Sequence, residues 1–466
     1  MTNVKRLVVV GHGAAGLAAA LAAAEQARDR GLNIEITLLE KTPAEEAGGN
    51  TRWSPSYMRM AAPDRIEASF EDDMMKASGG LADPDYYRTL VQHAVETVGW
   101  LQTHGVGFST PVYYLSVGPP RIQPAGGGRE IVERLLQSAT RAGVKIRYDC
   151  PAARLGMANS RINGVTVRSN DDVTTTVDAD AVILATGGFQ GSHTMMLEHF
   201  GAGAETLRLI APGTRWDTGD GIRMATDRGA NVSGDWNGMH IEPVDPRSGY
   251  PAPVVLVYPY GIVVDQNGMR FFDEGAGLVH ETWEAFARDI HFARPNRVAY
   301  AILDSRLFDI PGYERAIRSD VLPYQSDTIE DLAALIDVPV LNLRSTIAAY
   351  NCAATGDASR FNPTRCDGLA TESTLEPSKS NWARPITQPP FLAYPLIGAI
   401  AYTFGGLATN LRAEVLSMAG PIPGLYAAGE TTGHFYGVAP NAVSILRALV
   451  FGRIAGRQAV DFLAQE

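Results

Sequence analysis

Short apolar runs alternate with helix-forming stretches over the first forty residues. Residues 6–10 (RLVVV) form a short apolar run that is typical of a strand buried on both faces. The Ala- and Leu-rich stretch at 17–31 (LAAALAAAEQARDRG) predicts a helix that ends at Gly31, and residues 34–40 (IEITLLE) predict a second strand. The pattern therefore predicts a strand–turn–helix–strand unit that opens an α/β domain.

The remaining chain changes character twice. Comparable patterns predict helices at 84–105, 129–143, 222–230 and 444–466, and strands at 144–150, within 161–186 and at 180–188. Between about 232 and 384 the chain holds aromatic residues, prolines and short mixed elements instead, and after Pro385 apolar strands with glycine corners return. We therefore expect one α/β domain from residues 1–231 and 385–466, interrupted by an inserted α+β domain at 232–384.

Composition and charge narrow the function classes. The 466 residues carry a formal net charge of −11 without a basic block, which argues against nucleic acid as the main partner. No apolar run reaches the ~18 residues of a membrane-spanning helix. The three cysteines, Cys150, Cys352 and Cys366, are scattered, which excludes a disulfide scaffold and predicts no metal site. Because the first residues show no cleavable signal pattern either, the sequence predicts a cytoplasmic enzyme.

A glycine motif, GHGAAG, joins the first predicted strand to the helix. Gly11 permits a tight turn, Gly13 lets the backbone approach a pyrophosphate, and Gly16 lets the helix lie close to the sheet. Glu40, at the end of the second strand, can accept hydrogen bonds from a ribose and would repel a 2′-phosphate, so NADP is disfavoured. The unit predicts dinucleotide binding without separating FAD from NAD, and a tight turn in another α/β protein is the alternative.

Motifs spread over most of the chain resemble one flavoprotein superfamily. They are GHGAAG, LLEK, GGNT, ATGGF, TGDGI, RFFDEG, GLYAAGE and FGRIAG, in that order. The set resembles fumarate reductase, succinate dehydrogenase, 3-ketosteroid dehydrogenase and, most closely, tricarballylate dehydrogenase. The resemblance implies a Rossmann-like FAD-binding domain of the glutathione-reductase type and a mobile capping domain, with the substrate between them against the flavin.

The resemblance also implies which residues bind FAD. The residues expected to hold the ADP half are Gly11, Gly13, Ala15, Gly16, Glu40 and Lys41, and those expected near the flavin end are Gly49, Asn50, Thr51 and Asp220. The edge of the sheet beside the cofactor is expected at Ala185, Thr186 and Gly187. Gly429 and Glu430 are expected to hold the ribityl chain, and Ser444 and Ile445 to contact the pyrimidine edge of the flavin. Succinate dehydrogenases tether the flavin through a histidine in the segment that matches GGNTRW. This segment has no histidine here, so noncovalent FAD is expected.

The chain departs from the family pattern at two positions that matter for chemistry. Fumarate reductases have a proton-donating arginine four residues beyond the glutamate of the RFFDE match, where this chain has Leu278. A second, carboxylate-binding arginine aligns near Ala439. Succinate–fumarate interconversion is therefore disfavoured. Ketosteroid dehydrogenases place a tyrosine before the proline of the same loop, and its absence also disfavours steroid 1,2-desaturation.

Polar side chains that remain near the expected flavin are the catalytic candidates. They are Tyr402, His240, Tyr436 and Tyr258, with Tyr260 as a further tyrosine, and each has a packed, hydrogen-bonded core residue as its alternative. A tyrosine hydroxyl can donate to a carbonyl or exchange a proton. Arg52, Arg121 and Arg215 are candidate cations for an acidic substrate, with a structural or solvent-facing role as the alternative.

The sequence thus predicts an FAD-dependent oxidoreductase of a CH–CH bond beside a carbonyl or carboxyl group. In this hypothesis Tyr402 exchanges the proton, N5 of the flavin exchanges hydride, and His240 and Tyr436 orient the activating group. The expected partners are an organic acid or a cyclic ketone and a separate electron donor or acceptor. A flavin hydroxylase or oxidase, and a flavin-binding subunit without catalysis, are the alternatives.

Overall fold

A computed structural model of the chain describes residues 4–112, 114–115, 117–168 and 173–465. The apolar run at the start forms β1 (Lys5–Val10), which lies inside a six-stranded sheet. In order across the sheet, its strands are β18 (Glu414–Ser417), β19 (Gly420–Ala427), β9 (Ala181–Leu184), β1, β2 (Ile34–Leu39) and β5 (Lys145–Arg147). All neighbours pair in parallel except β18, and the buried strands β1 and β9 are apolar throughout their inner residues, as parallel strands covered on both faces require.

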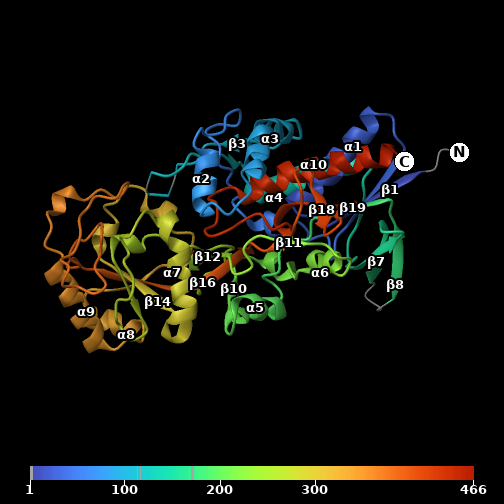
Figure 1. Ribbon diagram of the computed structural model, residues 1–466. Helices are drawn as coiled ribbons and strands as arrows, with labels where there is room; N and C mark the ends of the chain where they lie inside the picture. The colour runs from blue at the N-terminus through green and yellow to red at the C-terminus, as the bar shows by residue number, and fades with distance from the viewer. Residues whose placement is uncertain (1–3, 113, 116, 169–172, 466) are drawn as a thin grey trace.

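Helices cover this sheet and complete the first lobe. Their bounds are α1 (Ala14–Asp29), α2 (Phe70–Ala77), α3 (Pro84–Thr103), α4 (Gly127–Arg141), α5 (His193–Phe200), α6 (Asp220–Thr226) and α10 (Ser444–Ala464). The first and last helices, α1 and α10, run side by side (Figure 1), and Gln26 on α1 donates to the carbonyl oxygen of Arg457 on α10 at 3.1 Å. An antiparallel meander of β6 (Ala152–Ala158), β7 (Arg161–Arg168) and β8 (Thr174–Asp178) flanks the sheet.

The second lobe contains its own sheet around the long strand β16 (Phe391–Thr403). Its other strands are β10 (Arg208–Leu209), β12 (Met239–Val244), β13 (Ile262–Asp265), β14 (Ala299–Leu303) and β15 (Tyr324–Ser326), and its helices are α7 (Val279–Ala293), α8 (Ile329–Leu335) and α9 (Val340–Ala353). Two-stranded pairs join β3 (Phe108–Ser109) to β4 (Gln123–Pro124) and β11 (Val232–Ser233) to β17 (Gly406–Leu407). Figure 1 shows α7, α8 and α9 in the lobe opposite α1 and α10.

The α/β fold class expected from the sequence, with a second α+β lobe, is confirmed. The division at residues 231 and 384 stays a prediction, because β16 follows the second boundary yet pairs with β12 and β14 of the second lobe. Helix boundaries differ from the predicted ones by a few residues. The helix expected at 17–31 spans Ala14–Asp29, and the one expected at 222–230 spans Asp220–Thr226. No helix among the described residues is long and apolar enough to cross a membrane.

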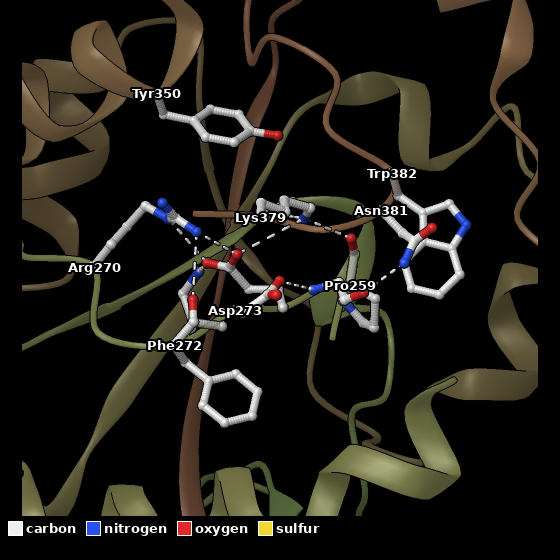
Figure 2. Close-up of polar contacts among 12 residues, drawn as sticks. Pro259, Arg270, Phe272, Asp273, Tyr350, Lys379, Asn381 and Trp382 are labelled. Atoms are coloured by element: carbon white, nitrogen blue, oxygen red, sulfur yellow. Dashed lines mark hydrogen bonds and ion pairs between the residues drawn. The ribbon is translucent and has the colours of Figure 1, made fainter. Parts of the chain in front are cut away.

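A buried ionic cluster holds the second lobe together (Figure 2). The cluster consists of Arg270, Glu274 and Lys379, all at most 9% exposed. Arg270 donates to Glu274 through Nε at 3.1 Å and Nη2 at 2.7 Å, and the backbone N–H of Val263 donates to the same carboxylate at 2.7 Å. Lys379 donates to the carbonyl oxygens of Pro259, at 2.7 Å, and Gly261. The RFFDEG motif therefore supplies the inner support of this lobe.

Candidate active site

A cavity that is open to solvent, with about 1160 Å³ of empty space, follows the edge of the first sheet at the ends of β1, β2 and β9. Every residue that the sequence predicts for FAD lines it except Gly16: Gly11, Gly13, Ala15, Glu40, Lys41, Gly49, Asn50, Thr51, Ala185, Thr186, Gly187, Asp220, Gly429, Glu430, Ser444 and Ile445. The segments that carry them lie far apart in the chain and meet because parallel strands end at the same edge.

Two glycines of the first turn let the chain close around one end of this cavity. Gly11 has a φ of 108°, and a Cβ there would lie 2.1 Å from the carbonyl oxygen of Ala185. A Cβ on Gly16 would lie 1.9 Å from the carbonyl oxygen of Gly11, so Gly16 acts beneath the cavity wall rather than on it. The helix α1 starts directly afterwards with no acidic residue in its first turn. Its N-terminus is therefore suited to the diphosphate of a dinucleotide.

A carboxylate and an unpartnered hydroxyl mark the position of a ribose. Glu40 is buried, and its two oxygens accept hydrogen bonds from the backbone N–H groups of His12, at 2.9 Å, and Thr42, at 2.8 Å. The Oγ1 atom of Thr42 is buried beside it and has no hydrogen-bond partner among the described residues. A buried hydroxyl of this kind is normally satisfied, so the wall lacks a polar ligand at this point. The residues present fit the adenosine half of FAD.

Further along, acidic groups line the cavity beside Lys41. Burial raises the pKa of Glu430 to about 7, although the Thr403 N–H donates to its Oε1 at 3.0 Å. Burial and the charge of Glu430 raise the pKa of Asp217, which accepts a hydrogen bond from Gln190 at 2.8 Å. Protonated carboxyl groups can both donate to and accept from the hydroxyls of a ribityl chain. Asp217 was not predicted, although it stands only three residues before Asp220 in the same glycine-rich segment.

A second cavity, with about 960 Å³ of open space, adjoins the first. Both cavities share the residues Asn50, Ser54, Tyr402, Ser444 and Ile445, so these form a common wall. The second cavity continues towards the second lobe, where Trp53, Tyr57, Tyr114, Arg121, His240, Glu242, His280, Trp283 and Arg318 line it. A ligand in this second cavity would thus lie next to the flavin end expected for the first.

Tyr402 stands in the common wall near the end of β16. Its hydroxyl has no hydrogen-bond partner within the described part of the chain, and its ring centroid lies 4.8 Å from that of His240. Burial and the negative charge of Glu284 raise the pKa of Tyr402 well above its ordinary value. The phenol is therefore protonated at neutral pH and can donate to a ligand in either cavity.

His240 is held by two glutamates that the sequence did not single out. Its Nε2 atom lies 2.9 Å from Glu242 Oε1, and its Nδ1 atom is hydrogen-bonded to Glu284 Oε1. Burial alone would lower the pKa of His240, but the charge of Glu284 and both hydrogen bonds raise it to about 10. Each ring nitrogen of His240 is thus occupied by a glutamate, and neither is left to bind a substrate carboxylate.

The raised pKa of His240 predicts a specific loss of stability at alkaline pH. His240 titrates near 6.5 when exposed and near 10 in the fold, so its contribution is fully present below pH 6.5 and disappears as the pH rises through 10. Glu284→Gln removes the largest charge that raises this pKa. We expect the free energy of unfolding, measured in urea with saturating FAD, to decline less between pH 6.5 and 10 in this variant than in the wild type.

A matched surface variant controls this measurement. Glu330 has a side chain 50% exposed at the start of α8, far along the chain from His240. Glu330→Gln should leave the wild-type dependence on pH unchanged. Parallel wild-type and Glu284→Gln curves would mean that Glu284 does not hold His240 in its charged form.

The structure does not bring the other predicted side chains into the second cavity. Tyr258 is buried against Thr282, 3.0 Å from its Oγ1, and the Tyr436 hydroxyl accepts a hydrogen bond from the Gly234 N–H at 3.1 Å. Tyr260 donates to the carbonyl oxygen of Pro363 at 2.7 Å. None of the three lines either cavity, and each has a partner within the fold.

The candidate cations Arg52, Arg121 and Arg215, and the two positions where the family has an arginine, differ in whether they line the second cavity. Arg215 is exposed and pairs with Glu46, while Arg52 donates to the Ala47 carbonyl oxygen at 3.4 Å. Only Arg121 of the three lines the second cavity. Ala439 lines it as well, and its backbone N–H donates to Glu284 Oε2 at 3.1 Å. Leu278 precedes α7 and lines neither cavity.

Comparison with known proteins agrees with this geometry. The chain is 28% identical over 482 residues to the probable fumarate reductase Ifc3 of Shewanella frigidimarina (strain NCIMB 400), covering 97% of this chain and 74% of that protein. It is 28% identical over 514 residues to vinyl phenol reductase of Lactiplantibacillus plantarum (strain ATCC BAA-793 / NCIMB 8826 / WCFS1), covering 99% and 97%. The open conformation of a flavocytochrome c3 fumarate reductase superposes with a TM-score of 0.78 at 26% identity, covering 99% of this chain and 79% of that chain.

The family itself follows from a match over nearly the whole sequence. Residues 6–444 match the family described as the FAD binding domain, a range that ends at the start of α10 and contains every residue lining the two cavities except Ile445, Arg447 and Ala448. The superfamily resemblance expected from the motifs is thereby confirmed, and so is FAD as the cofactor. The chain belongs to the FAD binding domain family.

Proposed function

We propose that the protein is an FAD-dependent oxidoreductase that acts on a CH–CH bond next to a carbonyl or carboxyl group, either as a desaturase or in the reverse, reductive direction. The observation that carries the proposal is the common wall: Tyr402, whose hydroxyl has no partner among the described residues, lines both the first cavity and the second. Relatives named as reductases of fumarate and vinyl phenol support this reaction class.

The chain holds the cofactor along the first cavity. The N-terminus of α1 and the turn at Gly11 would hold the diphosphate, Glu40 and Thr42 would bind the adenosine ribose, and Glu430 with Asp217 would bind the ribityl chain. Bound FAD supplies hydride exchange at N5. No histidine stands among the described residues that line this cavity, which supports noncovalent binding.

Tyr402 handles the proton in this proposal. Its phenol is protonated at neutral pH, so it can donate a proton to the carbon next to the activating group in reduction. Desaturation reverses this transfer and needs the phenolate, which the raised pKa disfavours, so Tyr402 is better suited to the reductive direction. His240 does not hold substrate directly. It lies against the ring of Tyr402 and is fixed in place by Glu242 and Glu284, and we assign it a positioning role.

A separate electron donor or acceptor and a cytoplasmic location belong to the same proposal. All three cysteines are free, and Cys352 and Cys366 are exposed, which suits a reducing compartment. Flavin chemistry of this kind needs a second redox partner in each cycle, because FAD must be reduced and reoxidised.

The reaction class is tested with the purified yellow protein under anaerobic conditions. We expect acid precipitation to release the FAD, and the reduced protein to be reoxidised by an α,β-unsaturated acid or ketone. A protein that holds FAD but responds to no enoate or enone would favour a flavin-binding subunit without catalysis. Rapid reoxidation by O₂ alone, with a C4a-adduct spectrum, would favour a hydroxylase.

A further inference from the structure

Arg447 is a buried cation in the wall of the first cavity. It lies on α10, three residues after Ser444, and its side chain is almost completely buried. Its Cζ atom lies 3.8 Å from the ring centroid of Phe435, and its Nη1 atom donates to the carbonyl oxygen of Thr432 at 3.4 Å. The guanidinium also interacts with Tyr86, whose pKa burial raises, so that this phenol is neutral. None of these neighbours carries a charge, and the buried Nε atom has no hydrogen-bond partner among the described residues.

This cation forms no ion pair with a carboxylate in the described part of the chain. The other two arginines of α10, Arg453 and Arg457, both pair with Glu96, at 2.7 and 3.1 Å. The other cation that lines the first cavity, Lys41, pairs with Asp220 at 2.8 Å. A buried charge without a partner is costly, so the cavity beside this arginine is suited to a ligand group that carries negative charge.

Arg447 lies at the end of the first cavity that adjoins the second. Phe435, over which the guanidinium stacks, lies 6.1 Å from Tyr402 of the common wall, measured between ring centroids. Ser444 and Ile445, which are expected at the pyrimidine edge of the flavin, precede Arg447 on the same helix and belong to the common wall as well. The positive end of the α10 dipole points to the same place.

The other charges around this wall are negative or already paired. Burial and three carboxylates raise the pKa of Tyr402, whereas the charge of Arg447 lowers it; the carboxylates are those of Glu284, Glu242 and Glu430. The first two are bonded to the protonated His240. Glu430 forms no ion pair with Arg447, and burial raises its pKa to about 7, so it is only partly charged at neutral pH. Arg447 is thus the cation that offsets these carboxylates from the side of the first cavity.

We propose that Arg447 stabilises the negative charge of the reduced flavin and thereby raises the midpoint potential of the bound cofactor. The inference rests on FAD in the first cavity and not on the proposed reaction at a CH–CH bond. Reduction adds two electrons from the redox partner and one proton at N5, while N1 stays unprotonated and the pyrimidine part gains a negative charge. The oxidised ring is neutral and gains less from the same guanidinium, so the reduced form is bound more tightly.

Two equilibrium measurements test this role. The midpoint potential of the holoenzyme is measured anaerobically against a reference dye, with dithionite as the reductant, and the dissociation constant of oxidised FAD is measured separately. The variants are Arg447→Met, Arg447→Gln, which keeps an N–H donor for Thr432, and Arg447→Lys, which keeps the charge. Arg457→Met is the matched control, because Arg457 lies on the same helix, is 40% exposed and lines neither cavity.

We expect Arg447→Met and Arg447→Gln to weaken the binding of reduced FAD relative to oxidised FAD by about tenfold or more. For a two-electron couple this lowers the midpoint potential by about 30 mV or more. Arg447→Lys should restore part of the difference, and Arg457→Met should keep the wild-type potential. The reduced wild-type protein should show the near-ultraviolet spectrum of the anionic reduced flavin at neutral pH.

Four results would overturn the proposal. The first is a wild-type potential in Arg447→Met and Arg447→Gln at normal FAD content. The second is equal weakening of oxidised and reduced FAD, which would mean that Arg447 holds another part of the cofactor. The third is loss of oxidised FAD from both uncharged variants, and the fourth is an N1-protonated reduced flavin in the wild type. No substrate enters these measurements, so failure of the proposed reaction would leave the inference standing.

Discussion

Tyr402→Phe should reduce turnover by about 100-fold or more, because it removes the proton-exchanging hydroxyl while keeping the ring. The ring contacts remain, with centroids 4.8 Å from His240 and 5.9 Å from Phe404. FAD content and ligand affinity should therefore stay close to those of the wild type. Stopped-flow reoxidation of the reduced holoenzyme measures the chemical step apart from binding.

Tyr436→Phe is the matched control for this prediction. It deletes a hydroxyl of the same kind that accepts a hydrogen bond from Gly234 and lies outside the two cavities. We expect its turnover to remain near that of the wild type. If Tyr402→Phe is as active as Tyr436→Phe, the proton is exchanged by another group and the assignment of Tyr402 is wrong.

Arg270→Met should destabilise the second lobe by about 3–5 kcal/mol, the usual loss when one partner of a buried ion pair is removed. Glu274 is completely buried and, within the part of the chain that the structure describes, keeps only the Val263 N–H and the more distant Lys379, at 4.0 Å, as partners. Because Arg270 also donates to the Pro377 carbonyl oxygen at 2.6 Å, the segment around Pro377 loses a hydrogen bond as well. Urea unfolding at constant FAD concentration gives the difference in free energy.

Arg344→Met provides the comparison. Its closest acidic partner, Glu330, is 3.7 Å away on the surface, so we expect a change within about 0.5 kcal/mol. A similarly small effect of Arg270→Met would contradict the role of the Arg270–Glu274 pair as the inner support of the second lobe.

Local patterns predicted the α/β fold of the first lobe, and the residues predicted for FAD, apart from Gly16, line one cavity there. The turn from β1 to α1, the acidic end of β2 and the glycines after β9 are short stretches whose residues act next to one another in the chain. A Cβ added at Gly11 or Gly16 would collide with the backbone, so only glycine fits there. This strict requirement is why the motif can be recognised from the sequence alone.

The second cavity was less predictable because its polar groups converge from distant elements. His240 lies on β12 and Glu284 on α7, 44 residues later, and no periodicity in the sequence connects them. Sequence also does not say which way a tyrosine points: Tyr258 and Tyr402 both follow apolar stretches, yet one lies in the core and the other in a cavity wall. Arg121 follows two prolines in an irregular segment, where nothing local indicates its burial.

The common wall has a thermodynamic consequence. Tyr402, Ser444 and Ile445 line both cavities, so ligands in the two cavities would share these side chains, and any effect of one ligand on the affinity for the other must be reciprocal. Whatever factor separates the affinity of a substrate for the oxidised and reduced holoenzyme must also shift the midpoint potential of the flavin. The difference in midpoint potential between the flavin and its redox partner then depends on whether substrate is bound. Substrate binding would therefore change the driving force for electron transfer before any bond in the substrate is formed or broken.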